Sequence, residues 1–255
     1  MKKIAIPLTH VVFLDPGIII KNRLVSIPEG IAAAIIFCIG FTPITALAFA
    51  LMGICSLSLG TLILVVPAIT LALTLGCYHG QHGTLMWRGY LMGIIAVACY
   101  DCVRIPFTMM GWMDDFIPKI GGMLLGDGDP HVVIGYLWRY LGNGGGMGMA
   151  FVCGYALLRH RFLLLRLLGG LNAALLFGCF VWACLMVTLL LSPHGEEVMF
   201  AITPMSLSLS LIGHLVFGCA LGCLVRKDEA KQLFSTPDEC KRKRMILLMK
   251  KFRML

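Results

Sequence analysis

Charged side chains are scarce in this sequence. They make up 13% of its 255 residues, against 59% hydrophobic residues, and none lies in the run from Ile31 to Leu75. A soluble domain of this length could not bury so much apolar surface, so a soluble globular protein is excluded. Apolar runs of about 20 residues recur, which is the length a helix needs to cross ~30 Å of hydrocarbon. The composition, with a mean hydropathy of +0.90, predicts an all-α integral membrane protein.

Common catalytic signatures are also absent. The sequence contains no phosphate-binding P-loop, dinucleotide fingerprint, zincin motif or Gly-x-Ser-x-Gly elbow. Cys77-x-His79-x-x-His82 lacks a fourth zinc ligand. The carboxylates of Asp127 and Asp129 fit a solvated face better than a cation site. We therefore expect no metal and no cofactor, and the sequence favours a protein that is not an enzyme.

The positions of the cysteines imply no disulfide framework. Most of the 11 lie within apolar runs, where a free thiol behaves as a small hydrophobe. Cys99-x-x-Cys102 has the spacing of a thiol oxidoreductase pair. Residues 103–152 and 193–197 hold no second pair to complete a relay, so redox chemistry is the least favoured function.

Basic residues are concentrated at the two ends of the chain. Of the 21 Lys and Arg, ten lie from Arg226 onward and four precede Ile31. Six spans with both termini inside leave only Arg104, Lys119 and Arg139 outside, as the positive-inside rule requires. The sequence thus predicts an inner (plasma) membrane protein with both termini cytoplasmic. The basic tail 226–255 is expected to bind anionic lipid and not nucleic acid.

The apolar runs divide into six predicted spans. Residues 1–28 are assigned to a cytoplasmic or interfacial segment because Asp15-Pro16 interrupts their short apolar stretch. Asp129-Pro130 has the pattern of an N-cap followed by proline in the first helical turn. The spans are 29–52, 57–77, 86–107, 131–158, 167–191 and 199–225, within a transmembrane domain 29–225; the connections include a cytoplasmic loop with His79, His82 and Arg88 and an acidic loop at 193–197.

Two spans carry matching glycine patterns. The fourth contains Tyr-x3-Gly-x3-Gly from Tyr140 to Gly148, and the sixth contains His-x3-Gly-x3-Gly from His214 to Gly222. Glycines at this spacing allow close helix packing, which predicts a tight inner bundle of the third, fourth and sixth spans. At these residues, chiefly 137–158 and 211–224, the chain resembles a group of small bacterial multi-pass membrane proteins. That resemblance implies a helical fold and no particular activity.

Polar residues gather between Tyr100 and Asn143, a stretch that we call the outer segment. Asp101 and Arg104 are three residues apart on the predicted third helix, so they can pair and orient Arg104 towards an anion. The alternative is a structural ion pair, because charges near the membrane are usually paired. The candidate substrate-binding residues are Tyr100, Asp101, Arg104, Asp114, Asp115, Lys119, His131, Arg139 and Asn143, with His214 deeper in the bundle.

The sequence allows alternative interpretations of the outer segment and of His214. Trp112, Phe116 and Pro118 favour a short amphipathic helix at the membrane interface, with its charges in water. His214 either relays protons or contacts substrate, or it is a neutral ring bonded across the bundle.

Three functions are compatible with the sequence. The first is a small permease or channel-like protein whose outer mouth binds an anion or a lipid headgroup through Arg104 and Arg139. The second is a lipid-modifying enzyme that uses Asp101, Asp114 or His131 as acid–base groups. The third is a non-catalytic membrane scaffold. The expected partners are the lipid bilayer and a small-molecule or lipid ligand, and a homo-oligomer is compatible with the sequence.

Overall fold

The computed structural model describes residues 29–78, 80–159 and 161–230. In these ranges all regular structure is helical and no strand occurs, which confirms the predicted all-α bundle. Residues 1–28 and 231–255 lie outside the described part of the chain, and so do the interfacial segment and most of the lipid-binding tail that were predicted there.

Among the described residues, five helices are long and apolar enough to cross a membrane. Their number and length are those of a multi-pass membrane protein. The five are α2 (Glu29–Leu51), the continuous series α3 (Leu57–Gly60), η1 (Thr61–Val65) and α4 (Val66–Tyr78), α5 (Gly80–Met109), α9 (Leu163–Leu191) and α11 (Pro204–Ala230).

The region of the predicted fourth span forms three consecutive helical pieces. They are α7 (Val132–Leu137), the π-helical η2 (Trp138–Gly144) and α8 (Gly145–Leu158). Leu137 and Gly144, at the two junctions, keep right-handed helical backbone angles, so the chain continues without a turn. Short π-helical stretches inside α-helices are frequent at functional sites. Here the stretch carries Arg139 and Asn143.

The connection between α4 and α5 is shorter than the sequence suggests. The expected cytoplasmic loop with His82 and Arg88 is instead part of α5, which begins at Gly80. A Cβ atom at Gly83 would collide with the carbonyl group of Gly76, so only glycine allows the two helices to approach this closely at their turn.

Two other helices begin later than expected. The fourth helical stretch starts at Val132, and Asp129 does not cap it. The sixth span starts at Pro204. Phe200 lies before this helix and is buried, with its ring 5.7 Å from that of Phe116. Burial of this aromatic pair holds the preceding segment against the bundle.

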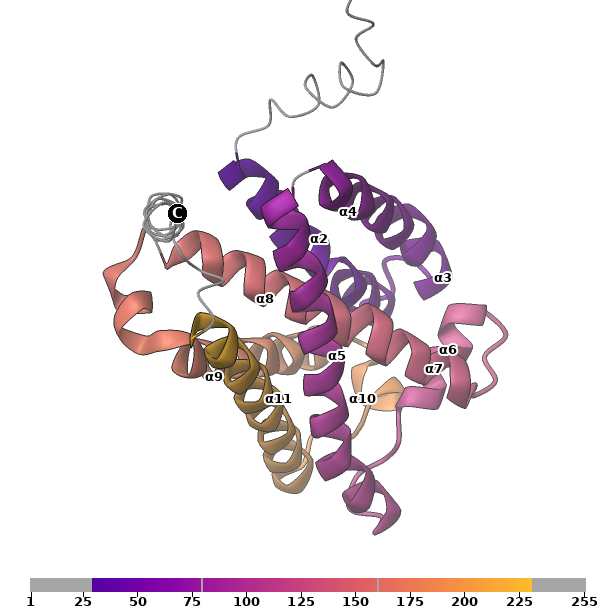
Figure 1. Cartoon of the computed structure of the whole chain (residues 1–255). Coiled ribbons are helices and arrows are strands. Elements are labelled where there is room, and N and C mark those ends of the chain that lie inside the picture. Colours follow the sequence, from indigo (N-terminus) through magenta and orange to yellow (C-terminus); the bar gives the residue numbers. More distant parts are fainter. Residues whose placement is uncertain (1–28, 79, 160, 231–255) are drawn as a thin grey trace, which may run out of the picture.

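Glycines set the contact between α5 and α8, which cross near the centre of the bundle (Figure 1). A Cβ atom at Gly89 would lie 2.8 Å from the carbonyl oxygen of Gly148. One at Gly93 would collide with the carbonyl group of Gly144. The backbones therefore touch directly, as predicted for small residues at this spacing.

The glycines of the sixth span have a different partner from the one expected. A Cβ atom at Gly218 would lie 2.6 Å from the carbonyl oxygen of Ala174, and Gly222 lies against Leu171, so this face packs on α9. The helix α11 reaches α5 through Gly213, which makes room for the Tyr100 ring. The inner bundle thus includes the fifth span as well as the third, fourth and sixth.

The outer segment contains a short amphipathic helix, but of the three residues that predicted one only Pro118 lies in it, because Trp112 and Phe116 precede it. This helix is α6 (Ile117–Leu125), with Pro118 in its first turn and Gly126 in the left-handed conformation at its end. Its buried face packs against α7, and its last carbonyls, those of Met123 and Leu124, accept hydrogen bonds from the Ser58 hydroxyl. These contacts fix α6 across the end of the bundle that carries the outer segment.

Candidate functional site

Asp101 and Arg104 form the predicted pair on α5. The Arg104 Nε donates to Asp101 Oδ1 over 3.0 Å. Only 1% of Asp101 and 3% of Arg104 are exposed, so both charges are removed from solvent. A buried ion pair is stable only with further hydrogen bonds, and neighbouring helices supply them here.

Arg139 reaches the same carboxylate from η2. Its Nε lies 2.9 Å from each carboxylate oxygen of Asp101, and its Nη2 lies 2.7 Å from Oδ1. The Nη2 contact has the distance of an ion pair but not the angles of a hydrogen bond, which leaves Nη2 with unused donor capacity. The guanidinium lies 4.6 Å over the ring of Tyr100.

Asp115 and Tyr136 complete the charged network. Arg104 Nη1 donates to Asp115 Oδ1 over 2.9 Å, and Arg104 Nη2 donates to the Tyr136 hydroxyl over 2.8 Å. That hydroxyl in turn lies 3.3 Å from Asp115 Oδ2. We call Asp101, Arg104, Asp115, Tyr136 and Arg139 the charged network. Its two carboxylates balance its two guanidinium groups.

Three other candidate residues do not join this network. Asp114 is exposed. Lys119 donates to the backbone carbonyl of Glu197 over 2.9 Å. His131 Nε2 lies 2.7 Å from Asp127 Oδ2, in a pair at the surface. The outer segment is thus divided into the charged network, in which Asp101 and Arg104 are buried, and separate surface contacts.

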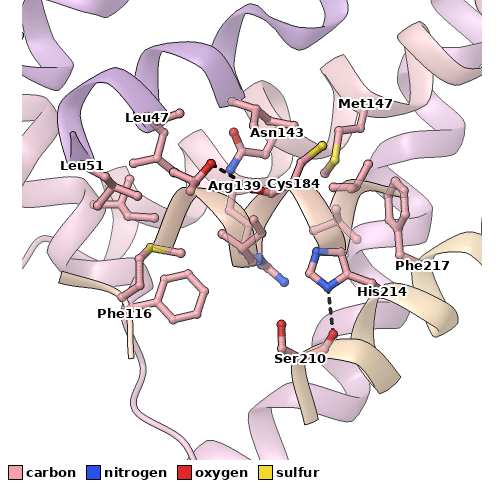
Figure 2. A pocket seen from close by; sticks show the side chains of 18 of the residues that line it. Leu47, Leu51, Phe116, Arg139, Asn143, Met147, Cys184, Ser210, His214 and Phe217 are labelled. Atoms are coloured by element: carbon pink, nitrogen blue, oxygen red, sulfur yellow. Dashed lines mark hydrogen bonds between the residues drawn. The ribbon is translucent and has the colours of Figure 1, made fainter. Parts of the chain in front are cut away.

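A cavity of about 320 Å³ adjoins the network. Its walls come from α2, α5, α6, the η2–α8 stretch, α9 and α11, and most of its lining is apolar (Figure 2). Arg139, Asn143, Ser210 and His214 form a polar strip within this lining, which we call the polar edge. Tyr100 also lines the cavity, next to the His214 ring at 5.4 Å between centroids.

The polar edge has unused hydrogen-bonding capacity. His214 Nδ1 lies 2.8 Å from the backbone carbonyl of Ser210, which can only accept, so Nδ1 carries the hydrogen. In the neutral ring Nε2 is then an acceptor, and Figure 2 shows this side of the ring turned to the cavity. Asn143 Oδ1 and Ser210 Oγ are buried without a hydrogen-bond partner among the described residues.

The end of the cavity beside the outer segment is closed. Phe116, Ile117 and Ile120, at the start of α6, line it and are at most 5% exposed, and Phe200 beside them is 2% exposed. The predicted outer mouth is therefore covered by α6. Asn172, the expected inward continuation of a polar path, does not line the cavity and bonds to the Leu168 carbonyl of its own helix.

Sequence reasoning missed two residues of this region. Ser210 lies one turn before His214 on α11, so the helical period alone places both on one face. Tyr136 lies 32 residues from Arg104, and no local spacing connects them.

We found no match to this chain among protein-family models, curated proteins or solved structures. The fold assignment rests on the helices themselves, and the functional interpretation rests on the cavity and its polar edge.

Proposed function

We propose that this multi-pass membrane protein is a small permease-like protein that binds a solute or lipid in the cavity. The polar end of the ligand would be held by Arg139, Asn143 and His214. The observation that carries the proposal is the pair of buried, unpartnered polar atoms, Asn143 Oδ1 and Ser210 Oγ, in residues that line a cavity of about 320 Å³.

Energetic and geometric arguments both support a ligand site. An unsatisfied buried polar atom costs roughly 1–3 kcal/mol, so such atoms in a native protein need an explanation. A cavity of about 320 Å³ lies at the lower end of the range for small-molecule sites, about 300–1,000 Å³. An apolar lining with a few convergent polar groups is typical of such sites.

The scaffold is the second candidate, and the charged network favours it. Each of its four charges has an opposite partner, as a structural ion-pair cluster requires. A scaffold does not account for the cavity or its polar edge. A lipid-modifying enzyme receives less support, because both oxygens of Asp101 face guanidinium groups, while Asp114 and His131 lie elsewhere.

The inner-membrane location and cytoplasmic termini belong to the proposal too. The distribution of Lys and Arg along the chain supports them. In this orientation α6 covers the outer end of the cavity.

Thermal unfolding of the detergent-purified protein tests the proposal. The ligands are inorganic anions, phospholipids and single-chain amphiphiles, because a ligand that binds only the folded state raises its apparent stability. We expect at least one ligand to raise the Tm, and Asn143→Leu to abolish that shift. Asn172→Leu, a matched control outside the cavity, should preserve it. If no ligand raises the Tm of the wild-type protein, the scaffold hypothesis is favoured.

A further inference from the structure

The cavity opens sideways, between α2 and α9. Apart from the polar edge, its exposed and half-buried lining residues all lie on these two helices. Phe41, Thr45 and Ala48 are half-buried on α2, whereas Phe180 and Cys184 are exposed on α9. The lining residues from α5, α6 and α11 are buried. A molecule in the cavity would therefore face the hydrocarbon between α2 and α9.

Two contacts bound this lateral opening. At its inner end the rings of Phe41 and Phe177 meet at 6.0 Å between centroids. At its outer end the Ser192 hydroxyl donates to the Leu51 carbonyl. From Phe41 to Leu51 the helix rises ~15 Å at 1.5 Å per residue. The opening is thus about as long as half of the ~30 Å hydrocarbon core, the depth of one leaflet.

The charges around the cavity disfavour a ligand whose polar head is charged. Arg139 is the only Lys or Arg in the described cavity lining, and it already contacts both oxygens of Asp101. An anionic head would enter a low-dielectric space with no uncompensated cation, which is costly. The same holds for a cationic head, because no carboxylate belongs to the described lining.

The polar edge offers both a donor and an acceptor. Neutral His214 presents Nε2 as an acceptor, and Arg139 Nη2 has donor capacity left. A hydroxyl group can donate to the first and accept from the second, whereas a carboxylate cannot donate. The cavity volume of about 320 Å³ is within the range of small-molecule sites, so the apolar lining has room for an alkyl chain beside the head.

We propose that the cavity takes a single-chain, lipid-derived amphiphile with an uncharged hydroxyl head, which enters from the bilayer between α2 and α9. The proposal rests on the proposed function and specifies its ligand. The hydroxyl lies at the polar edge, and the chain extends along Phe180 and Cys184 towards the opening.

Photolabelling in lipid nanodiscs tests this assignment. The probe is an aliphatic alcohol with a diazirine in its chain, and the competitors are decanol and decanoate. We expect labelling of the cavity-lining parts of α2 and α9, and competition by decanol at about tenfold lower concentration than decanoate, equivalent to ~1.4 kcal/mol. Ala48→Phe should fill the opening and abolish this labelling, while Ala34→Phe, on the same helix but outside the cavity, should preserve it.

The outcomes separate the two proposals. Equal or better competition by decanoate would overturn the uncharged head but leave a ligand-binding cavity. Labelling confined to lipid-facing surfaces, and unchanged by Ala48→Phe, would overturn both. Cys184→Trp blocks the opening from an exposed position on α9, so it replaces Ala48→Phe if that variant does not fold.

Discussion

The charged network and the polar edge are adjacent and share Arg139, but they differ in how their polar atoms are satisfied. In the network every charge meets an opposite charge at hydrogen-bond distance. At the polar edge, Asn143 Oδ1 and Ser210 Oγ have no partner in the described ranges. The network therefore has the properties of a structural element, and the polar edge has those of a binding surface. Substitutions in the two regions should have opposite effects on stability.

The largest effect is expected at the centre of the network. Asp101→Ala would leave two buried guanidinium groups without their shared carboxylate. Breaking a buried ion pair from one side costs about 3–5 kcal/mol, so the folded protein should be lost or strongly destabilised. Thermal unfolding in detergent measures this, with exposed Asp129→Ala as the control. Equal melting of the two variants would show that the network is not structural.

A smaller loss is expected at the edge of the network. Asp115→Ala removes one partner of Arg104, but the Asp115 side chain is 37% exposed, so water can replace it in part. The expected cost is about 1.5 kcal/mol, the lower limit for hydrogen bonds to charged groups. Unfolding of Asp115→Ala beside Asp114→Ala, its exposed neighbour, measures the difference. A loss as large as that of Asp101→Ala would mean that α6 depends on this single contact.

Removal of the Tyr136 hydroxyl should have a still smaller effect. Tyr136→Phe leaves the Arg104 guanidinium paired with Asp101 and Asp115. Side-chain hydrogen bonds between membrane helices average about 0.6 kcal/mol, which is the loss expected here. Tyr90→Phe, which keeps its ring contact with Trp87, is the control in the same unfolding assay. If Tyr136→Phe and Tyr90→Phe lose the same stability, the Tyr136 hydroxyl adds none of its own and Tyr136 contributes through packing alone.

At the polar edge a substitution should leave stability unchanged or raise it. Ser210→Ala removes an unsatisfied hydroxyl and keeps the backbone carbonyl that binds His214, so stability should stay equal or rise. Ser206→Ala, on the same helix, removes a hydroxyl bonded to the Ala201 carbonyl and should cost about 1 kcal/mol. Unfolding of both variants without ligand measures this contrast. A loss at Ser210 equal to that at Ser206 would show that Ser210 already has a partner.

The fold class followed from the sequence because one physical requirement dominates it. Apolar runs of this length must cross a bilayer, and a helix satisfies its own backbone there. Local spacing also predicted the Asp101–Arg104 pair, since residues three apart on a helix are neighbours. Glycine spacing predicted close packing between helices, but it did not predict which helix each glycine contacts. Gly218 packs on α9, and a one-dimensional pattern does not specify which helix lies opposite.

The candidate site was only partly predictable, because its character depends on residues that are distant in sequence. Asp101, Arg104, Asp115 and Arg139 were all expected in one region, but their mutual neutralisation requires Asp115 to turn back onto α5. That turn also brings α6 over the cavity and closes the expected outer mouth. The sequence predicted the amphipathic helix, but its apolar face could as well have covered lipid as the bundle.

The π-helical η2 also determines which residues of the fourth helix lie on the same face. Arg139 and Gly144 are five residues apart, a spacing that an α-helix would place ~140° apart and that the wider π-helical turn brings back to one face. The Asp101 partner Arg139 and the glycines that touch α5 can therefore face their neighbours at the same time. Deletion of Gly142 should restore a uniform α-helix and keep both contacts in register, because Arg139 and Gly144 would then be four residues apart. The π-helical turn thus lets a single helix serve both the charged network and the glycine contact.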